Sequence, residues 1–525
     1  MEQKLPALIA AMSRGEFYPD HPSRVELRQT HISYVFLAGP YVYKIKKPLR
    51  LPFLDYSTLA QRHRFCQEEI RLNRRLAPAT YLKVVPIRKE GECFSLAENS
   101  SASGAIIEYA VKMNRLPDDQ MLSFRIERDS VEPDHIRAIA KKLASFHETA
   151  SVEKAEALGS PQAIGARVRA NFQETRRFIG RTIGPKMFGK IQAYSEAFLR
   201  ENFDLLRSRT LEGRVREGHG DLRAEHVCLL DDIVIFDCIE FDEGLRYGDI
   251  ASEIGFLSMD LDFLRARALA AELEEVYASL ARDPALRSPL LPFYKCYRAY
   301  VRGKVESLKS DEQEVPNEER RHASTEALRY FCLSSRYTRE KSQRMLLLVV
   351  CGMVGTGKST VARLLSDLSG FPVLNSDRIR KTLVPLAPKT PPHEGYGHGI
   401  YREEFNELTY NALLAETGRH LERGQGVIVD ATFKDSKHRS LFINRAANSG
   451  VPAFFIECVT NEETVRRRLA DRAKSPDEIS DATWEIYERM RGEFNPLGEI
   501  PEGRHFQIDT EHKLVNGLDR LEEIL

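Results

Sequence analysis

The stretch GMVGTGKST, residues 352–360, constrains the fold of this 525-residue chain more than any other. It fits the pattern GxxxxGK[ST], with Lys358 and Ser359 at its end. Glycine lets the backbone curl until successive N–H groups point inward, where they can hold phosphate oxygens. An apolar strand-like run, residues 346–350, precedes the loop. A helix-spaced apolar series follows it, made of Val361, Leu364, Leu365 and Leu368.

The residues of this loop have distinct expected roles in holding a nucleotide. Lys358 is expected to reach the β- and γ-phosphates, and the Ser359 hydroxyl is expected to ligate magnesium. A helix that begins at the loop directs its positive N-terminal end at the phosphates. The expected cofactors are therefore ATP or GTP, with Mg²⁺. We assign nucleotide binding to Gly352, Met353, Val354, Gly355, Thr356, Gly357, Lys358, Ser359 and Thr360.

The part of the chain after Arg344 alternates apolar runs with helical patterns. The runs are MLLLVV, FPVLN, GVIVDATF, PAFFIECV and HFQID. Strands separated by helices indicate a parallel sheet, because each helix returns the chain to the same edge. We predict an α/β P-loop NTPase domain over residues 345–525, with a five-stranded, mainly parallel sheet.

Two carboxylates follow strand-like runs of this domain. Asp377 follows FPVLN, and Asp430 ends GVIVD. The carboxyl ends of parallel strands face the ligand crevice of such a sheet. Asp377 is therefore a candidate base for an attacking hydroxyl, although Ser376 and Asp377 also suit the capped start of a helix. Asp430 is a candidate magnesium ligand, and Thr432 is a candidate residue of the acceptor pocket.

The segment TVRRRLADRAKS supplies a cluster of arginines. Arg468 and Arg472 are four residues apart, so they would share one face of a helix. Such a face suits a lid that neutralises charge during phosphoryl transfer. A solvated basic helix is the alternative.

The stretches GMVGTGKST, NSDRIRK, VIVDATF and RRRLADR occur in the order found in P-loop kinases of the gluconate kinase, zeta-toxin and polynucleotide-kinase type, which this half resembles. Such domains often carry the label AAA ATPase, although the sequence has no sensor or arginine-finger pattern of a ring-forming motor. The resemblance implies ATP-dependent phosphorylation of a hydroxyl, with Asp377 as the acceptor-side acid. Variable segments such as residues 384–401 are expected to build the acceptor pocket, and they carry no readable code for the acceptor.

Short β-rich runs alternate with turn residues over the first hundred or so positions. Two strand-like runs flank Ala38-Gly39-Pro40, which predicts a hairpin. The stretch STLAQRHRFCQEEIRLNRRLA predicts a helix with Ser57 as its cap.

A second candidate site lies upstream of the loop, in HGDLRAEHVCLLDDIVIFD, residues 219–237. Strand-like runs at 227–230 and 233–236 flank two aspartates, which predicts another hairpin. This hairpin would return Asp237 towards the loop that holds Asp221. Two converging carboxylates suit one catalytic base and one magnesium ligand, and an ordinary acidic hairpin is the alternative.

The motif HGDL…FD resembles the catalytic region of the aminoglycoside phosphotransferases, within the protein-kinase-like fold. The resemblance spans about residues 30–300 and implies that Asp221 is catalytic and that Asp237 binds magnesium. The stretch YVYKIKK then matches the strand with the nucleotide lysine, best placed at Lys44, with Lys46 as the alternative. Glu69 matches the residue with which that lysine pairs.

One position departs from the pattern of that family. Five residues after the motif aspartate the family usually has asparagine, a magnesium ligand, and here His226 stands. Neutral imidazole is a poor magnesium ligand, because this ion prefers oxygen. Either Asp237 holds the metal with additional water molecules, or the activity of this site is altered or lost.

The composition restricts the classes of partner. Hydrophobic residues make up 42% and charged residues 29%, as in soluble globular proteins, and the length of 525 residues suggests two or three domains. Lys plus Arg and Asp plus Glu number 77 each, so net charge does not predict binding to nucleic acid or a membrane. No run approaches the roughly 18 apolar residues of a membrane span, and the charged N-terminal stretch is a poor signal peptide. A cytoplasmic protein is therefore expected.

We expect a two-domain phosphotransferase. An α+β protein-kinase-like domain would occupy residues 1–335, with a small lobe at about 1–115 and a helical large lobe at about 116–335. The P-loop kinase domain would follow over 345–525. The acceptor would be a hydroxyl of a small molecule or of a nucleic acid, and no membrane partner is expected. A nucleotide-operated regulatory protein with one degenerate site and a polynucleotide 5′-hydroxyl kinase are the alternatives.

Overall fold

The computed structural model describes residues 4–51, 54–97, 104–339, 345–383, 403–472 and 483–525, so the expected acceptor-pocket segment 384–401 lies outside the described residues. The chain divides into two compact units. The first comprises Met1–Arg169 and Phe198–Arg298, and the second comprises Ala170–Ala197 and Ala299–Leu525. The domain limits 1–335 and 345–525 stay predictions.

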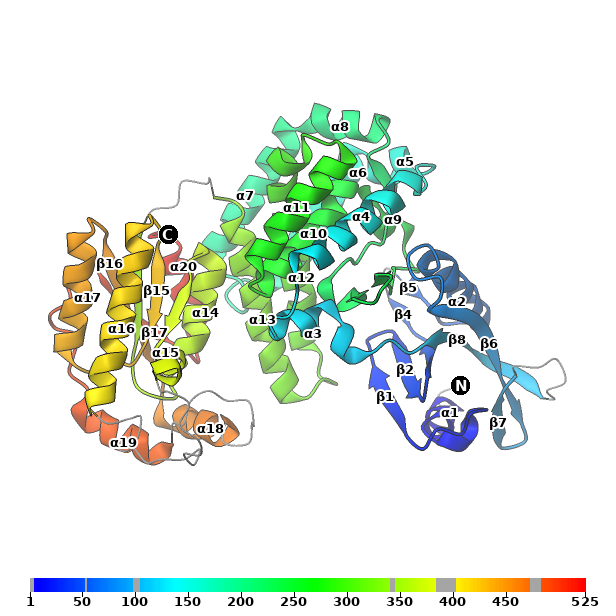
Figure 1. Ribbon diagram of the computed structural model, residues 1–525. Coiled ribbons are helices and arrows are strands. Elements are labelled where there is room, and N and C mark those ends of the chain that lie inside the picture. Colours follow the sequence, from blue (N-terminus) through cyan, green and yellow to red (C-terminus); the bar gives the residue numbers. More distant parts are fainter. Residues whose placement is uncertain (1–3, 52–53, 98–103, 340–344, 384–402, 473–482) are drawn as a thin grey trace. The chain divides into compact units, whose positions relative to one another are not determined.

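An antiparallel sheet of six strands forms the first part of unit 1 (Figure 1). Helix α2 (Leu59–Asn73) packs against β6 and β8. In order across the sheet the strands are β1 (Val25–Gln29), β2 (Ser33–Ala38), β3 (Tyr41–Lys46), β8 (Ala105–Asn114), β6 (Tyr81–Glu90) and β7 (Cys93–Leu96).

The local signals in this part are partly confirmed. Ala38 pairs with Tyr41, so the expected hairpin turns at Gly39, whose φ of 61° suits glycine. The expected cap of α2 is wrong by one residue. The Thr58 side chain, and not that of Ser57, accepts the hydrogen bond from the Gln61 N–H. Ser57 instead donates its hydroxyl to Asp55.

The described chain between residues 115 and 339 is mainly helical. Every residue of α10 is buried, so this helix is the centre of its helical layer. The helices are α3 (Leu122–Glu127), α4 (Pro133–Thr149), α5 (Ala155–Gly159), α6 (Pro161–Thr175), α7 (Pro185–Glu201), α8 (Phe203–Leu211), α9 (Glu243–Arg246), α10 (Ile250–Phe263), α11 (Arg267–Ala281), α12 (Leu291–Asp311) and α13 (Asn317–Arg336). Two short antiparallel pairs join β9 (Val215–Glu217) to β12 (Tyr247–Asp249) and β10 (Val227–Cys228) to β11 (Val234–Ile235).

A parallel sheet of five strands forms the centre of unit 2, and every strand pair in it is parallel. Helix α13 packs against α14 (Lys358–Ser369), the helix that follows the glycine-rich loop. In order across the sheet the strands are β14 (Val373–Asn375), β15 (Val427–Asp430), β13 (Leu347–Cys351), β16 (Ala453–Val459) and β17 (His505–Asp509). The remaining helices are α15 (Ser376–Leu383), α16 (Glu403–Glu422), α17 (Ser436–Asn448), α18 (Glu462–Arg472), α19 (Trp484–Glu493) and α20 (Leu514–Leu521).

Both faces of this sheet are covered, because alternate residues of its central strands are buried on each side. Leu347 and Val349 pack with α16 and α17, through Leu413 and Phe442. Their neighbours in β13 are also fully buried, and α14 contacts β13, β14 and β15. The fold class is confirmed: an α+β protein-kinase-like part is followed by an α/β P-loop domain.

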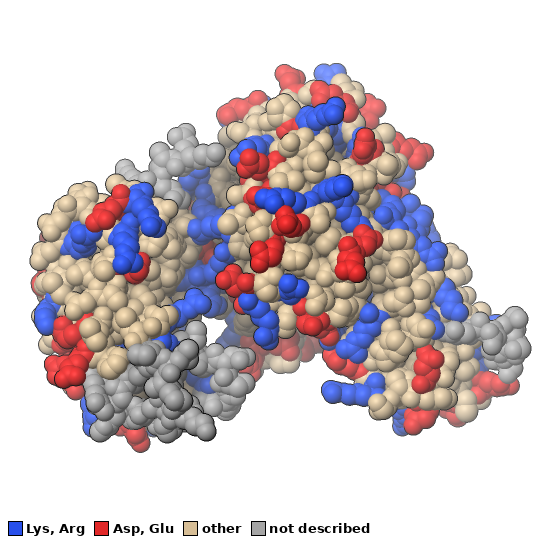
Figure 2. Space-filling model, in the orientation of Figure 1, with Lys and Arg blue, Asp and Glu red and all other residues tan. Residues whose placement is uncertain are grey.

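Charged side chains of both signs are interspersed over the face that Figure 2 shows, in accord with equal numbers of acidic and basic residues. Among the described helices, none is long and apolar enough to cross a membrane.

Candidate functional site

The glycine-rich loop has the curled backbone that the sequence predicts. Gly352, Gly355 and Gly357 adopt φ values of 131°, 76° and 91°, which side chains disfavour. A Cβ on Gly352 would lie 2.5 Å from the carbonyl oxygen of Cys458. The loop runs from the end of β13 to the start of α14, and Gly370 caps the C-terminal end of α14. Only glycine fits the first position without moving β16.

Lys358 is held against its own loop. Its Nζ donates a hydrogen bond to the Met353 carbonyl oxygen at 2.9 Å. Burial lowers the pKa of Lys358, and the charges of Asp430 and Asp377 act in the opposite direction. The lysine therefore lies within the electrostatic reach of both candidate carboxylates.

Asp430 lies buried at the carboxyl end of β15. Burial raises its pKa, while hydrogen bonds from Asn375 and Ser359 oppose the rise. Asn375 Nδ2 donates to Asp430 Oδ2 at 2.8 Å. The structure thus brings Ser359, the expected magnesium ligand of the loop, to Asp430.

Asp377 lies in the first turn of α15. The capping hydrogen bond of this helix comes from Asn375, whose Oδ1 accepts from the Arg378 N–H at 3.0 Å. The Asp377 side chain instead receives a hydrogen bond from Arg380 Nη1 at 2.9 Å. Because Asn375 caps α15, the Asp377 carboxylate is not used as the cap. Its Oδ1 accepts from Arg380, which leaves Oδ2 for another partner.

The arginines of α18 have separate partners. The Arg466 guanidinium lies 3.9 Å from the Trp484 ring centroid, and Arg467 pairs with Glu511 at 3.0 Å. Arg468 donates to Thr510 Oγ1 at 2.8 Å and lies 3.4 Å from the Gly355 carbonyl oxygen, so it is fixed at the loop. Arg472 ends α18 and contributes a repulsive charge at Lys358. The described part of α18 is therefore attached to the phosphate-binding loop through Arg468.

In unit 1, two lysines of β3 share one carboxylate. Lys44 Nζ lies 2.9 Å from Glu69 Oε1, and Lys46 Nζ lies 2.8 Å from Glu69 Oε2. Lys46 also pairs with Glu240, to which Tyr56 donates its hydroxyl. The Lys46 side chain is 0% exposed, whereas Lys44 reaches the partly exposed Asp237. Lys44 therefore lies beside Asp237, the expected magnesium ligand, whereas Lys46 is enclosed between Glu69 and Glu240.

Asp237 has a strained backbone and a strong cationic partner. Its φ of 63° is uncommon for a residue other than glycine. Although burial would raise it, the Lys44 ammonium at 2.6 Å holds the pKa of Asp237 well below its usual range. Asp237 is therefore a carboxylate anion whose side chain lies directly beside the Lys44 ammonium.

Asp221 and Asp237 converge on His226, as the predicted hairpin requires. His226 Nδ1 donates to the Asp221 carbonyl oxygen at 2.7 Å, and its Nε2 lies 3.8 Å from Asp237 Oδ2. The Asp221 carboxylate pairs with Arg223 Nη2 at 2.9 Å. Since Nδ1 is used within the protein, only Nε2 of His226 faces the site.

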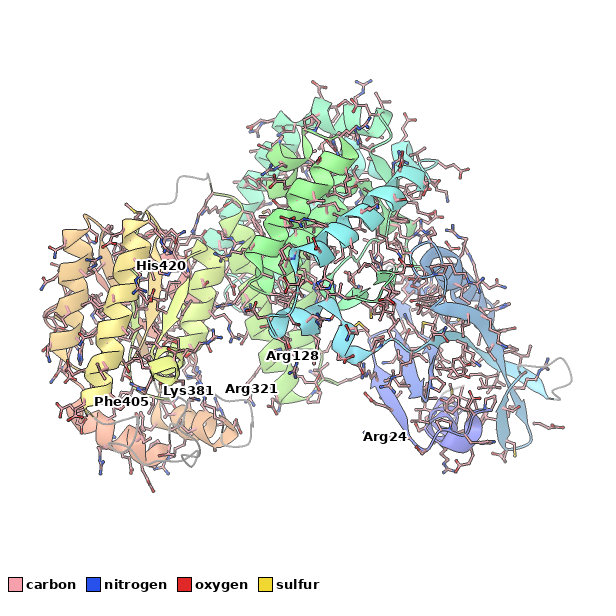
Figure 3. The ribbon with its side chains drawn as sticks, viewed as in Figure 1. Arg24, Arg128, Arg321, Lys381, Phe405 and His420 are labelled. Carbon is pink, nitrogen blue, oxygen red and sulfur yellow. The ribbon has the colours of Figure 1, made fainter. Side chains whose placement is uncertain are left out.

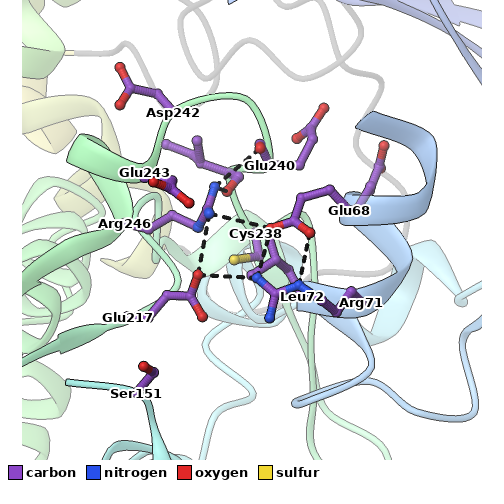
Figure 4. Close-up of polar contacts among 12 residues, drawn as sticks. Glu68, Arg71, Leu72, Ser151, Glu217, Cys238, Glu240, Asp242, Glu243 and Arg246 are labelled. Carbon is purple, nitrogen blue, oxygen red and sulfur yellow. Dashed lines mark hydrogen bonds and ion pairs between the residues drawn. The ribbon is translucent and has the colours of Figure 1, made fainter. Parts of the chain in front are cut away.

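A buried ionic network supports the segment that follows Asp237 (Figure 4). Arg246 Nη1 donates to the carbonyl oxygens of Ile239 and Glu240, at 3.0 and 3.1 Å. Its Nη2 lies 3.2 Å from Glu217, which also pairs with Arg71 of α2. The network therefore joins α2 to the loop that holds Asp237.

Several residues of these sites escape sequence reasoning. Arg223 is two residues from Asp221, and Glu240 is three residues from Asp237, so nearness to these aspartates was an available signal. Asn375 stands two residues before Asp377, but like Thr510 it gives no signal of its role, because a lone amide or hydroxyl occurs in many turns. The structure alone shows that they orient Asp430 and Arg468.

His219, the first residue of HGD, gives a pH-dependent contribution to stability. Burial lowers the pKa of His219 from 6.5 to about 4. Below pH 6.5 the unfolded chain therefore binds a proton at His219, whereas the folded chain binds this proton only when the pH falls to about 4. The contribution is complete above pH 6.5, and it is lost as the pH falls from 6.5 to 4, by about 3 kcal/mol in total. We expect a shallower fall of the unfolding free energy between pH 7.5 and pH 5 in His219→Gln, measured by urea unfolding. Equal falls in both proteins would contradict this.

Known proteins are similar to this chain well beyond its glycine-rich loop. The AAA domain family matches residues 347–497. The uncharacterized protein Rv2004c of Mycobacterium tuberculosis is 31% identical over 464 residues, which is 88% of this chain and 88% of the relative. A match of that length exceeds either expected domain, so it includes sequence of both sites. The chain belongs to the family of this mycobacterial protein. The matched length therefore extends over parts of both expected domains.

Solved structures resemble each part separately. The GDP complex of aminoglycoside 2′-phosphotransferase-IIIa covers 62% of this chain and 97% of its own, at 14% identity and a TM-score of 0.39. A gluconokinase from Sinorhizobium meliloti covers 34% of this chain and 96% of its own, at 17% identity and a TM-score of 0.24.

Proposed function

We propose that the chain is an ATP- and magnesium-dependent phosphotransferase that moves the γ-phosphoryl group to a hydroxyl acceptor. The observation that carries the proposal is the grouping around Lys358 in unit 2. A curled glycine loop, one lysine and the carboxylates of Asp377 and Asp430 lie within electrostatic reach of one another. A phosphate-rich ligand that arrives with a cation satisfies all of these groups together.

The donors at the loop fit magnesium. Ser359 and Asp430 offer a hydroxyl and a carboxylate oxygen, which are the ligand types this ion prefers. When bound there, Mg²⁺ would neutralise phosphate charge. Lys358 would hold the phosphates beside the backbone N–H groups of the loop, and α14 would present its positive end to them.

Asp377 is the proposed base. Its carboxylate would accept the proton of the acceptor hydroxyl as the new O–P bond forms and the bond to the leaving diphosphate breaks. Arg380 fixes this carboxylate from one side. Arg468, oriented by Thr510, and Arg472 would stabilise the negative charge of the transferring group.

Replacing Asp377 by Asn is expected to lower kcat by roughly 10²–10⁴-fold, because the proton acceptor is lost. Nucleotide affinity should stay within about twofold of wild type, since Asp377 does not belong to the loop. Steady-state kinetics with labelled ATP, together with calorimetric ATP affinity, separates the two effects. The matched control is Asp435→Asn, at the start of α17, which should retain kcat. An unchanged kcat in Asp377→Asn would rule out this role.

Unit 1 supports two functions. Lys44, Glu69, Asp237 and Asp221 suit a second phosphotransfer site, in which Asp237 would be the carboxylate ligand of magnesium and Asp221 the catalytic base. His226 fits the ion less well, because its Nδ1 is engaged and its free atom is nitrogen. The regulatory alternative, nucleotide binding without turnover, is favoured by one observation. Both carboxylates are already paired, Asp237 with Lys44 and Asp221 with Arg223.

A further inference from the structure

A cavity of about 770 Å³ lies in unit 1, outside both candidate sites. Its lining comes from the C-terminal halves of the neighbouring helices α4 and α11 and from residues 212–216, which include the start of the strand β9. Its volume lies within the range of about 300–1,000 Å³ that is typical of small-molecule sites. The lining residues are Lys141, Ala144, Ser145, His147, Glu148, Glu212, Arg214, Arg216, Ile250, Tyr277, Leu280, Ala281 and Arg282.

The charge of the cavity is positive. Four basic and two acidic side chains line it, which leaves two positive charges when His147 is neutral. Across the described ranges, no carboxylate lies within ion-pairing distance of Lys141, Arg214, Arg216 or Arg282. This distinguishes them from most buried arginines of the unit, such as Arg209, which is enclosed by Asp249 and Asp283.

Two of these arginines are held in place without being neutralised. Arg214 Nη1 donates to the Ala281 carbonyl oxygen, and Arg216 Nη1 donates to the Glu148 and Ala150 carbonyl oxygens, each at 3.0 Å. These bonds orient the guanidinium groups at the ends of two helices. A guanidinium has five N–H donors, so donors remain for a bound ligand.

The cavity also offers apolar surface. Leu280 is 47% exposed at this position, and the ring of Tyr277 lies fully buried in the wall. An anion with an organic part would cover Leu280, while its charged group met the guanidinium groups. Fixed forks of N–H donors match the oxygens of a phosphate.

We propose that this cavity binds a small organic phosphate. The wall of the site is connected to the HGD loop by two consecutive hydrogen-bond steps. His147 lies 2.7 Å from both Tyr277 Oη and Glu253 Oε2. Glu253 in turn accepts from the N–H groups of His219 and Gly220, the latter at 2.6 Å. The proposal does not depend on which reaction either nucleotide site performs.

The test is calorimetric titration of the full chain with its nucleotide sites saturated by a non-hydrolysable ATP analogue and Mg²⁺. The probes are glucose 6-phosphate, inorganic pyrophosphate and unphosphorylated glucose. We expect binding of the phosphorylated probes and none of glucose. Binding of pyrophosphate alone would keep the phosphate site but assign it to inorganic phosphates. Failure of both phosphorylated probes to bind more tightly than about 1 mM would overturn the proposal.

Paired variants locate the binding. Lys141→Gln with Arg282→Asn removes two exposed charges, and Asn suits the left-handed backbone at position 282, where φ is 49°. We expect about tenfold weaker binding. Lys142→Gln with Arg287→Gln removes the same charge outside the cavity lining and should leave the affinity unchanged. Equal affinities in the two double variants would reject this cavity as the site. Slower hydrogen exchange in peptides covering 141–150 and 277–282 should accompany binding to the wild type.

Discussion

Replacing Lys358 by Ala is expected to abolish high-affinity nucleotide binding in unit 2. Lys358 belongs to the loop, and its ammonium group donates a hydrogen bond to the Met353 carbonyl oxygen of the same loop. Without it, the phosphates lose a charge-assisted donor in a partly desolvated site. We expect at least roughly a hundredfold loss of affinity or turnover.

Calorimetry with an ATP analogue, performed in Mg²⁺, measures this effect directly. Lys381→Ala is the matched control, because this lysine is exposed on α15 (Figure 3). It should bind the analogue as the wild type does. Equal affinities of unit 2 in Lys358→Ala and Lys381→Ala would remove the lysine from the site.

Replacing Glu69 by Gln is expected to destabilise unit 1 by about 3–5 kcal/mol. Glu69 is 0% exposed and lies within 2.9 Å of both Lys44 and Lys46. Its neutralisation leaves the enclosed Lys46 with Glu240 as its carboxylate partner, and Lys44 with Asp237. The energy of a buried charge without full compensation is therefore added to the folded state.

Urea unfolding monitored by circular dichroism tests this, with Glu26→Gln as the control. Glu26 is a partly exposed residue of β1 and pairs with Arg28 at the surface, at 2.7 Å, so its loss should cost less than about 1 kcal/mol. If the two variants unfolded at the same urea concentration, the shared carboxylate would not be the stabilising element. Nucleotide affinity of Glu69→Gln, where it remains folded, reports the separate role of orienting Lys44.

The elements around both sites could be predicted because their signals are local. The five strand runs after Arg344 are apolar and separated by helices, which favours a mainly parallel sheet. The loop of glycines and the hairpin at Gly39 each need a backbone that few residues other than glycine adopt. The cap of α2 was missed because Ser57 and Thr58 have equivalent hydroxyls. Only the backbone geometry shows that Thr58 stands at the start of the helix.

Partners that come from distant segments could not be predicted. Lys44 and Lys46 stand on the same face of β3, and the choice between them depends on Asp237 and Glu240, nearly two hundred positions later. Likewise, Thr510 orients Arg468, and Asn375 at the end of β14 donates to Asp430 at the end of the neighbouring strand β15. Such contacts follow from sheet order, which periodicity does not encode.

The most direct measurement of the central claim is the transfer of γ-labelled phosphate from ATP, followed in three proteins. Wild type, Lys358→Ala and Asp221→Asn would be assayed against sugars, nucleosides, aminoglycosides and oligonucleotides with a 5′-hydroxyl. We predict that ATP consumption falls by at least roughly a hundredfold in Lys358→Ala and persists in Asp221→Asn. Full consumption in Lys358→Ala, with loss in Asp221→Asn, would contradict the account and assign the phosphotransfer to unit 1.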